Sequence, residues 1–163
     1  MQIQCTLNGQ LQNFEIHPGT LLSELLRSQG LFSVKHSCEQ GDSGCDAVLL
    51  DGRLINSSIT LAAQAHGRSV LTVEGIGHPE SLHPIQQSFV DCGAIQCGYC
   101  SPAMILSAYA LIAENPQPDE AAIRDCLSGI LCRCTGYAKP VEAILVAAQR
   151  MKENDHAIPG GRS

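Results

Sequence analysis

The chain has 163 residues, of which 44% are hydrophobic, with a formal net charge of −6 at pH 7 and a pI of about 5.4. This length suffices for one or two small domains with a modest core in each. The acidic balance argues against nucleic acid or an anionic membrane as the main partner, and no apolar run is long enough for membrane insertion. The first residues lack the basic start and long apolar segment of a signal peptide, so we expect a cytoplasmic protein.

The first part of the chain predicts a small mixed sheet with a helix packed across it. Asn8-Gly9 is a strong turn signal, because both residues tolerate the positive φ angles of a type I′ hairpin turn. Leucines at helical spacing predict a helix that starts near Thr20 and ends at Gly30. Strands are expected at 2–7, 11–16, 47–50, 53–55 and 69–74, a loop at 35–46 and a short helix at 59–66.

The second part of the chain predicts helices only. Residues 75–84 contain glycines, prolines and histidines and are typical of a linker. Four helical patterns follow, one of them opened by Ser101-Pro102 and another by Pro118-Asp119. Polar residues 154–163 predict a flexible tail. The expected fold class is therefore α+β, with a mixed sheet first and a helical bundle second.

Two close pairs of cysteines stand at junctions between these helices. Cys97 and Cys100 form a Cys-x-x-Cys pair, and Cys132 and Cys134 form a Cys-x-Cys pair about thirty residues later. Neighbouring positions of a regular element point in different directions, so these thiols converge only if both pairs lie on turns. Four thiolates around one centre suit an iron–sulfur cluster or a structural zinc ion, and paired disulfides are a third reading.

Taken together, the nine cysteines of the chain fit metal ligation better than a disulfide framework. The total of nine is odd, and the chain has no sign of export. Cys5 falls in a predicted strand, and Cys92 and Cys126 fall on the apolar faces of predicted helices. We expect these three to be core residues.

The motifs Gln-Cys-Gly-Tyr-Cys-Ser-Pro (96–102) and Leu-Cys-Arg-Cys-Thr-Gly-Tyr (131–137) closely resemble the small iron–sulfur subunit of the molybdenum hydroxylases, the xanthine dehydrogenase family. The resemblance covers nearly the whole chain. It implies a β-grasp ferredoxin-like domain over residues 1–76 and a four-helix [2Fe–2S]-binding bundle over 84–153. It also implies that Cys97, Cys100, Cys132 and Cys134 hold a [2Fe–2S] cluster, and that Gln96 lies against the molybdopterin of a large partner subunit. Alternatively, Gln96 is a solvated turn residue.

The chain departs from the family pattern in the first domain. A second, plant-type [2Fe–2S] cluster needs Cys-x₄-Cys-x₂-Cys and a further cysteine. Aligned from Cys38, those positions hold Cys38, Ser43, Asp46 and Ser58, and a further thiol, Cys45, stands beside them. Serine and aspartate oxygens are harder ligands than iron–sulfur clusters favour. We therefore expect one cluster and not two, with Cys38 and Cys45 as thiols, as a disulfide or as part of an unusual site.

The resemblance implies an electron-transfer subunit of a molybdenum-containing hydroxylase that acts on a purine or another nitrogen heterocycle. In the family, electrons come from the molybdopterin centre of the large subunit and pass through two clusters toward FAD on a further subunit. Without the second cluster, three alternatives stay open: the bundle cluster passes electrons to another acceptor, the reaction exports no net electrons, or the subunit is partly a scaffold. A different class of function remains open, in which the chain is a non-redox docking module and its four cysteines hold a structural metal such as zinc.

Overall fold

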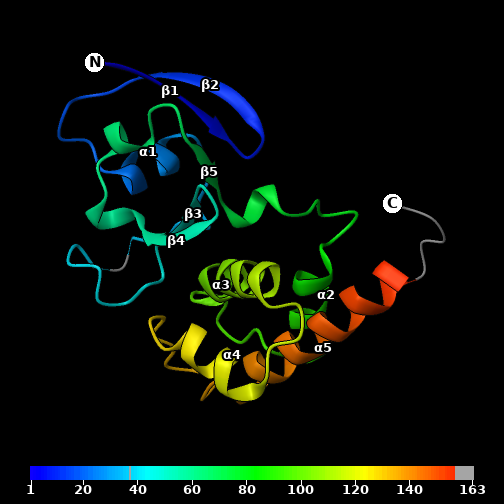
Figure 1. The fold of residues 1–163 in the computed structure, drawn as a ribbon. Helices are drawn as coiled ribbons and strands as arrows, with labels where there is room; N and C mark the ends of the chain where they lie inside the picture. The colour runs from blue at the N-terminus through cyan, green and yellow to red at the C-terminus, as the bar shows by residue number, and fades with distance from the viewer. Residues whose placement is uncertain (37, 157–163) are drawn as a thin grey trace.

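The computed structural model describes residues 1–36 and 38–156 (Figure 1). The strands and α-helices of this part are β1 (Gln2–Leu7), β2 (Gln10–Glu15), α1 (Leu22–Ser28), β3 (Ala47–Leu50), β4 (Arg53–Asn56), β5 (Ser69–Leu71), α2 (Pro84–Asp91), α3 (Ser101–Glu114), α4 (Glu120–Leu127) and α5 (Ala138–His156). Short 3₁₀ helices lie at Ser57–Ile59, Ala62–Ala65 and Val73–Gly75. The α+β class predicted from the sequence is confirmed.

The strands form one mixed sheet in the order β2-β1-β5-β3-β4. β1 pairs with β5 in parallel, and the other neighbours are antiparallel. The predicted turn between β1 and β2 is present, with φ of 49° at Asn8 and 82° at Gly9. Leu22 and Leu26 of α1 pack into one buried cluster with Leu7, Val48 and Val70 of the sheet. Leucine burial therefore holds α1 against the sheet.

Two elements of the first domain differ from the expectation. The helix expected at 59–66 is interrupted, because Ala62 N–H donates to the Thr20 carbonyl oxygen at 2.9 Å and its backbone is committed to the segment before α1. The last strand ends at Leu71, because the N–H of Thr72 donates to the Asn8 side chain at 2.9 Å. In both places a hydrogen bond to a residue distant in sequence overrides the structure that the local sequence pattern predicts.

The four helices α2 to α5 share a second core. Its largest fully buried side chains include Ile85, Phe89, Met104, Ile123 and Ile144. The expected apolar stripes of these helices are confirmed, except that Leu145 on the stripe expected for the last helix is 38% exposed. α5 continues to His156, into the segment predicted as a flexible tail, and residues 157–163 lie outside the described residues.

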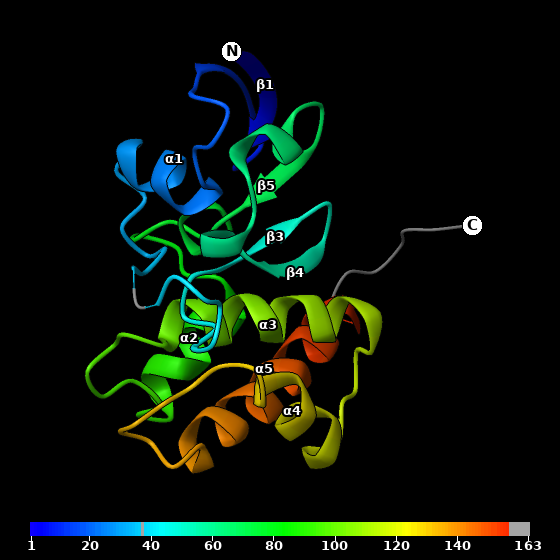
Figure 2. The same cartoon turned by 90° about the vertical axis from the view of Figure 1, so that its left-hand side faces the viewer.

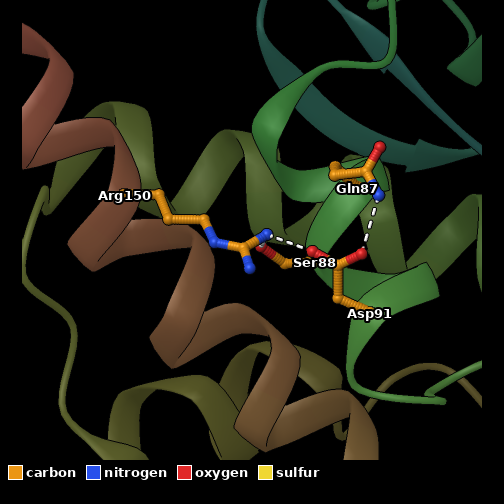
Figure 3. A network of polar contacts seen from close by, with 4 residues as sticks. All are labelled: Gln87, Ser88, Asp91 and Arg150. Carbon is orange, nitrogen blue, oxygen red and sulfur yellow. Dashed lines mark hydrogen bonds and ion pairs between the residues drawn. The ribbon is translucent and has the colours of Figure 1, made fainter.

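A polar network joins the first of these helices to the last (Figure 3). Arg150 on α5 donates to Ser88 at 3.2 Å and to Asp91 at 2.6 Å, and Gln87 donates to the other oxygen of Asp91 at 2.7 Å. Asp91 ends α2, where the helix dipole disfavours a negative charge. The guanidinium of Arg150 offsets this repulsion.

The helical part packs directly beneath the sheet, with α3 nearest to β3 and β4 (Figure 2). Cys45, in the loop before β3, and Ala47, the first residue of β3, belong to the core of the helices and not to the core of the sheet. The loop that precedes β3 therefore reaches the helical part, where the cysteine pairs lie.

Candidate metal centre

The two cysteine pairs lie on two turns that meet at one end of the helices. Cys97 precedes α3 and Cys100 is its N-cap residue, whereas Cys132 and Cys134 lie between α4 and α5. Gly98, with φ of 79°, adopts the left-handed conformation that the first turn requires. All four thiols line a single cavity of about 280 Å³. The convergence predicted from their spacing is present in the structure.

Within the cavity the thiols contact each other in two pairs. Cys100 lies close enough to Cys132, and Cys97 to Cys134, for each thiol to affect the ionisation of the other. The first pair is the inner one, since Cys100 is 6% exposed, whereas Cys97 and Cys134 are both exposed. Each pair takes one thiol from each turn, so both turns are needed to complete either half of the site.

Neighbouring sulfurs oppose the deprotonation of Cys100 and of Cys134. Burial raises the pKa of Cys100 to about 12, and the hydrogen bond and charge of Cys132 add to this effect. The pKa of Cys134 is also raised, because Cys97 hydrogen-bonds with it and repels its thiolate form. A bound cation reverses this preference, since metal ligation requires thiolates.

The surroundings of Cys132 favour its thiolate form. Burial alone would raise the pKa of Cys132, but hydrogen bonds from the Thr135 hydroxyl and the Thr135 and Cys134 backbones lower it. The Thr135 hydroxyl lies 3.0 Å from Cys132 Sγ, and the Thr135 N–H donates to the same sulfur at 3.4 Å. Such contacts to a ligand sulfur tune a metal centre.

Four thiols that converge on one cavity suit either of two metal types. Zinc binds four ligands around one ion, whereas a [2Fe–2S] cluster has two irons, each held by two protein ligands. The four thiols supply the number of ligands that each type needs.

The loop before β3 contributes to the same cavity, which the sequence did not indicate. Ser43 and Cys45 line it together with the four thiols. Leu131 N–H donates to the Ser43 carbonyl oxygen at 2.8 Å, and the Cys45 thiol donates to the Leu131 carbonyl oxygen at 3.5 Å. On the other turn, the Tyr99 hydroxyl donates to the His36 carbonyl oxygen at 3.2 Å. Both turns are thus held from the sheet side.

The other predicted site residues lie at the edge of this centre or apart from it. Gln96 is exposed, directly before the Cys97 turn. Cys38, Ser43, Asp46 and Ser58 lie in the first domain, and no disulfide joins cysteines within the described part of the chain. In that part of the chain, no helix has the length and apolar character needed to cross a bilayer.

Comparison with known proteins agrees with the site. Residues 72–145 match the family described as "[2Fe-2S] binding domain". The chain is 44% identical over 147 residues to the xanthine dehydrogenase iron-sulfur-binding subunit of Escherichia coli O157:H7, covering 88% of this chain and 91% of that subunit. This chain belongs to the small iron–sulfur subunits of the molybdenum hydroxylase family.

Solved structures of related enzymes have the same fold as this iron–sulfur subunit. A chain of quinoline 2-oxidoreductase from Pseudomonas putida 86 superposes with a TM-score of 0.89 at 40% identity, with 94% of this subunit and 96% of that chain covered. Aldehyde oxidoreductase from Desulfovibrio gigas gives a TM-score of 0.90 at 40% identity, over 94% of this subunit but only 17% of that chain. A unit like this one therefore also occurs as a small part of a much longer polypeptide.

Proposed function

We propose that the chain is the electron-transfer subunit of a multi-subunit molybdenum hydroxylase, and that Cys97, Cys100, Cys132 and Cys134 hold its [2Fe–2S] cluster. The observation that carries the assignment is the meeting of two thiol pairs in one cavity of about 280 Å³. When bound, a [2Fe–2S] cluster accepts and releases one electron at a time.

The residues around the cavity would set the properties of this centre. Buried Cys100 keeps water from the inner half, and the Thr135 hydroxyl stabilises negative charge on Cys132 Sγ. The domain arrangement that fits this role is a β-grasp ferredoxin-like domain over 1–76 and a four-helix cluster-binding bundle over 84–153. In this arrangement the bundle carries the cluster, and the first domain supports both ligand turns.

The exposed edge of the centre suits a large molybdopterin-binding partner subunit. Cys97 and Cys134 lie at this edge, beside two apolar side chains, Ile95 (42% exposed) and Leu131 (58% exposed). Exposed apolar residues around a redox centre favour a covering partner over open solvent. Gln96 is on the same turn, and we propose that it contacts the molybdopterin of that partner.

The substrate and the final acceptor depend on other subunits. The similarity to subunits of xanthine- and quinoline-oxidising enzymes supports a purine or another nitrogen heterocycle as substrate. An FAD-binding subunit is the acceptor that the family resemblance favours. We expect the assembled enzyme to act in the cytoplasm.

The test is a Cys132→Ser variant of the full chain, purified anaerobically beside the wild type. The wild type should be red-brown and bleach on reduction, with about two iron atoms per chain and one EPR signal, and the variant should lose all of these. Cys92→Ser is the matched control, because Cys92 is half-buried like Cys132 but does not line the cavity. A colourless wild type that contains zinc would refute the proposal in favour of a structural metal.

A further inference from the structure

The plant-type cluster positions of the first domain are still brought together in space. The Cys38 thiol donates to the Ser43 hydroxyl at 3.4 Å, and the Ser43 N–H donates to Cys38 Sγ at 3.3 Å. Asp46 and Ser58 are likewise in contact, because the Ser58 N–H donates to Asp46 Oδ2 at 2.7 Å. The fold therefore keeps these four positions as two contacting pairs.

The side chains at these positions do not fit an iron–sulfur cluster. They offer one thiol, two hydroxyls and one carboxylate. Iron–sulfur clusters are held by thiolates, and a serine hydroxyl is a weak ligand until it loses its proton. The donor set thus disagrees with the second cluster that the spacing would otherwise imply.

Asp46 links positions 46 and 58 through protein hydrogen bonds alone. It is 0% exposed, and its Oδ2 accepts the Ser58 N–H at 2.7 Å. Ser57 reinforces the link, because its hydroxyl donates to the Asp46 carbonyl oxygen at 2.6 Å. Asp46 therefore joins the start of β3 to the 3₁₀ turn after β4 without a metal.

The loop that carries Cys38, Ser43 and Asp46 contacts the turn between α4 and α5. Gly44 has φ of 64°, and a Cβ at this position would overlap the carbonyl oxygen of Gly129. On either side of Gly44, the Ser43 carbonyl oxygen and the Cys45 thiol both bond with the Leu131 backbone. The loop holds the turn that bears Cys132 and Cys134.

We propose that this subunit is a one-cluster relay, in which the first domain holds no iron, Asp46 fastens the former ligand loop, and that loop positions the ligand turn of the bundle. The inference rests on the proposed function for the bundle cluster. It implies that the electron acceptor takes electrons from the bundle centre directly, without a second cluster between them.

The first test is iron and EPR analysis of the full chain, wild type and Cys132→Ser. The wild type should contain about two iron atoms and one EPR signal, and Cys132→Ser should contain almost none. About four iron atoms in the wild type, or about two that remain in Cys132→Ser, would overturn the one-cluster relay. A wild type without any [2Fe–2S] signal would instead overturn the proposed function, so the two failures are distinguishable.

The second test restores the missing thiols in the triple variant Ser43→Cys/Asp46→Cys/Ser58→Cys. Ser58 Oγ has no hydrogen-bond partner among the described residues, so a sulfur in its place displaces no protein contact. Asp46→Cys removes the acceptor of the Ser58 N–H, and iron held by the restored thiolates would have to replace that link. Iron should rise from about two to about four atoms per chain, with a second EPR signal. The matched control adds Cys38→Ala, which removes the fourth thiol and should return the iron to the wild-type value. A soluble, folded triple variant without added iron would show that the loop no longer has the geometry of a cluster site.

Discussion

The phenolic oxygen of Tyr137 accepts a hydrogen bond from the backbone N–H of Cys132 at 2.9 Å, and it donates one to the Ile130 carbonyl oxygen at 3.0 Å. One hydroxyl thus satisfies two backbone groups of the turn that carries the second thiol pair. Tyr137 itself has φ of 66°, a conformation that is strained for a bulky residue. The strain indicates that its contacts fix the turn more strongly than its local backbone preference.

Tyr137→Phe should weaken the ligand turn and leave the fold intact. Two partly buried backbone groups lose their partner, which costs about 1–2 kcal/mol. The measurement is the guanidinium midpoint at which the visible absorbance of the bound cluster disappears. Tyr109→Phe, which removes a hydroxyl from α3 outside the turn, should leave this midpoint near that of the wild type. Equal midpoints for all three proteins would mean that the phenol does not hold the turn.

Gly44→Ala should destabilise the contact between the first domain and the ligand turn. The left-handed backbone costs an alanine about 1 kcal/mol, and overlap with the Gly129 carbonyl oxygen should raise the total above about 2 kcal/mol. Gly67→Ala is the control, because Gly67 also has positive φ (71°) but a Cβ there meets open space. In thermal unfolding, the Gly44 variant should therefore melt well below the Gly67 variant. Similar melting temperatures would mean that Gly44→Ala costs only backbone strain and that overlap with the Gly129 carbonyl oxygen adds nothing.

Local signals in the sequence predicted most of the elements and both ligand turns. Asn8-Gly9 and the leucines of α1 encode their structure within a few residues, and the cysteine pairs converge because each stands next to a helix end. The contact between Cys45 and Leu131 spans 86 residues and has no periodic signal on either side. This contact depends on the packing of the sheet against the helices. The interruption of the helix expected at 59–66 has a similar cause, a backbone hydrogen bond to Thr20 from across the fold.

Protonation of Asp91 should loosen the junction of α2 with α5. Hydrogen bonds from Gln87 and then from Arg150 hold the pKa of Asp91 below its usual range. Because the folded-state pKa is the lower one, the stabilisation is present above the unfolded pKa of about 4 and is lost as the pH falls through the folded value. Asp91→Asn should therefore lose less stability than the wild type between about pH 5 and pH 3, in urea unfolding at low salt. Asp125→Asn, an exposed change on α4, should keep the wild-type pH dependence of stability. If Asp91→Asn also keeps that pH dependence, Asp91 does not hold the junction of α2 with α5 as predicted.

Thr135→Val should lower the reduction potential of the bundle cluster. The Thr135 hydroxyl lies 3.0 Å from Cys132 Sγ, and a hydrogen bond to a ligand sulfur stabilises the more negative, reduced state. Loss of a hydrogen bond of about 1 kcal/mol corresponds to about 40 mV for a one-electron couple. The measurement is a redox titration followed by EPR. Thr135→Ser keeps the hydroxyl and should restore the wild-type potential, which a purely steric role of the threonine methyl group would not do. If instead the serine variant shifts and the valine variant does not, the methyl group and not the hydroxyl acts on the centre, because valine keeps that methyl group.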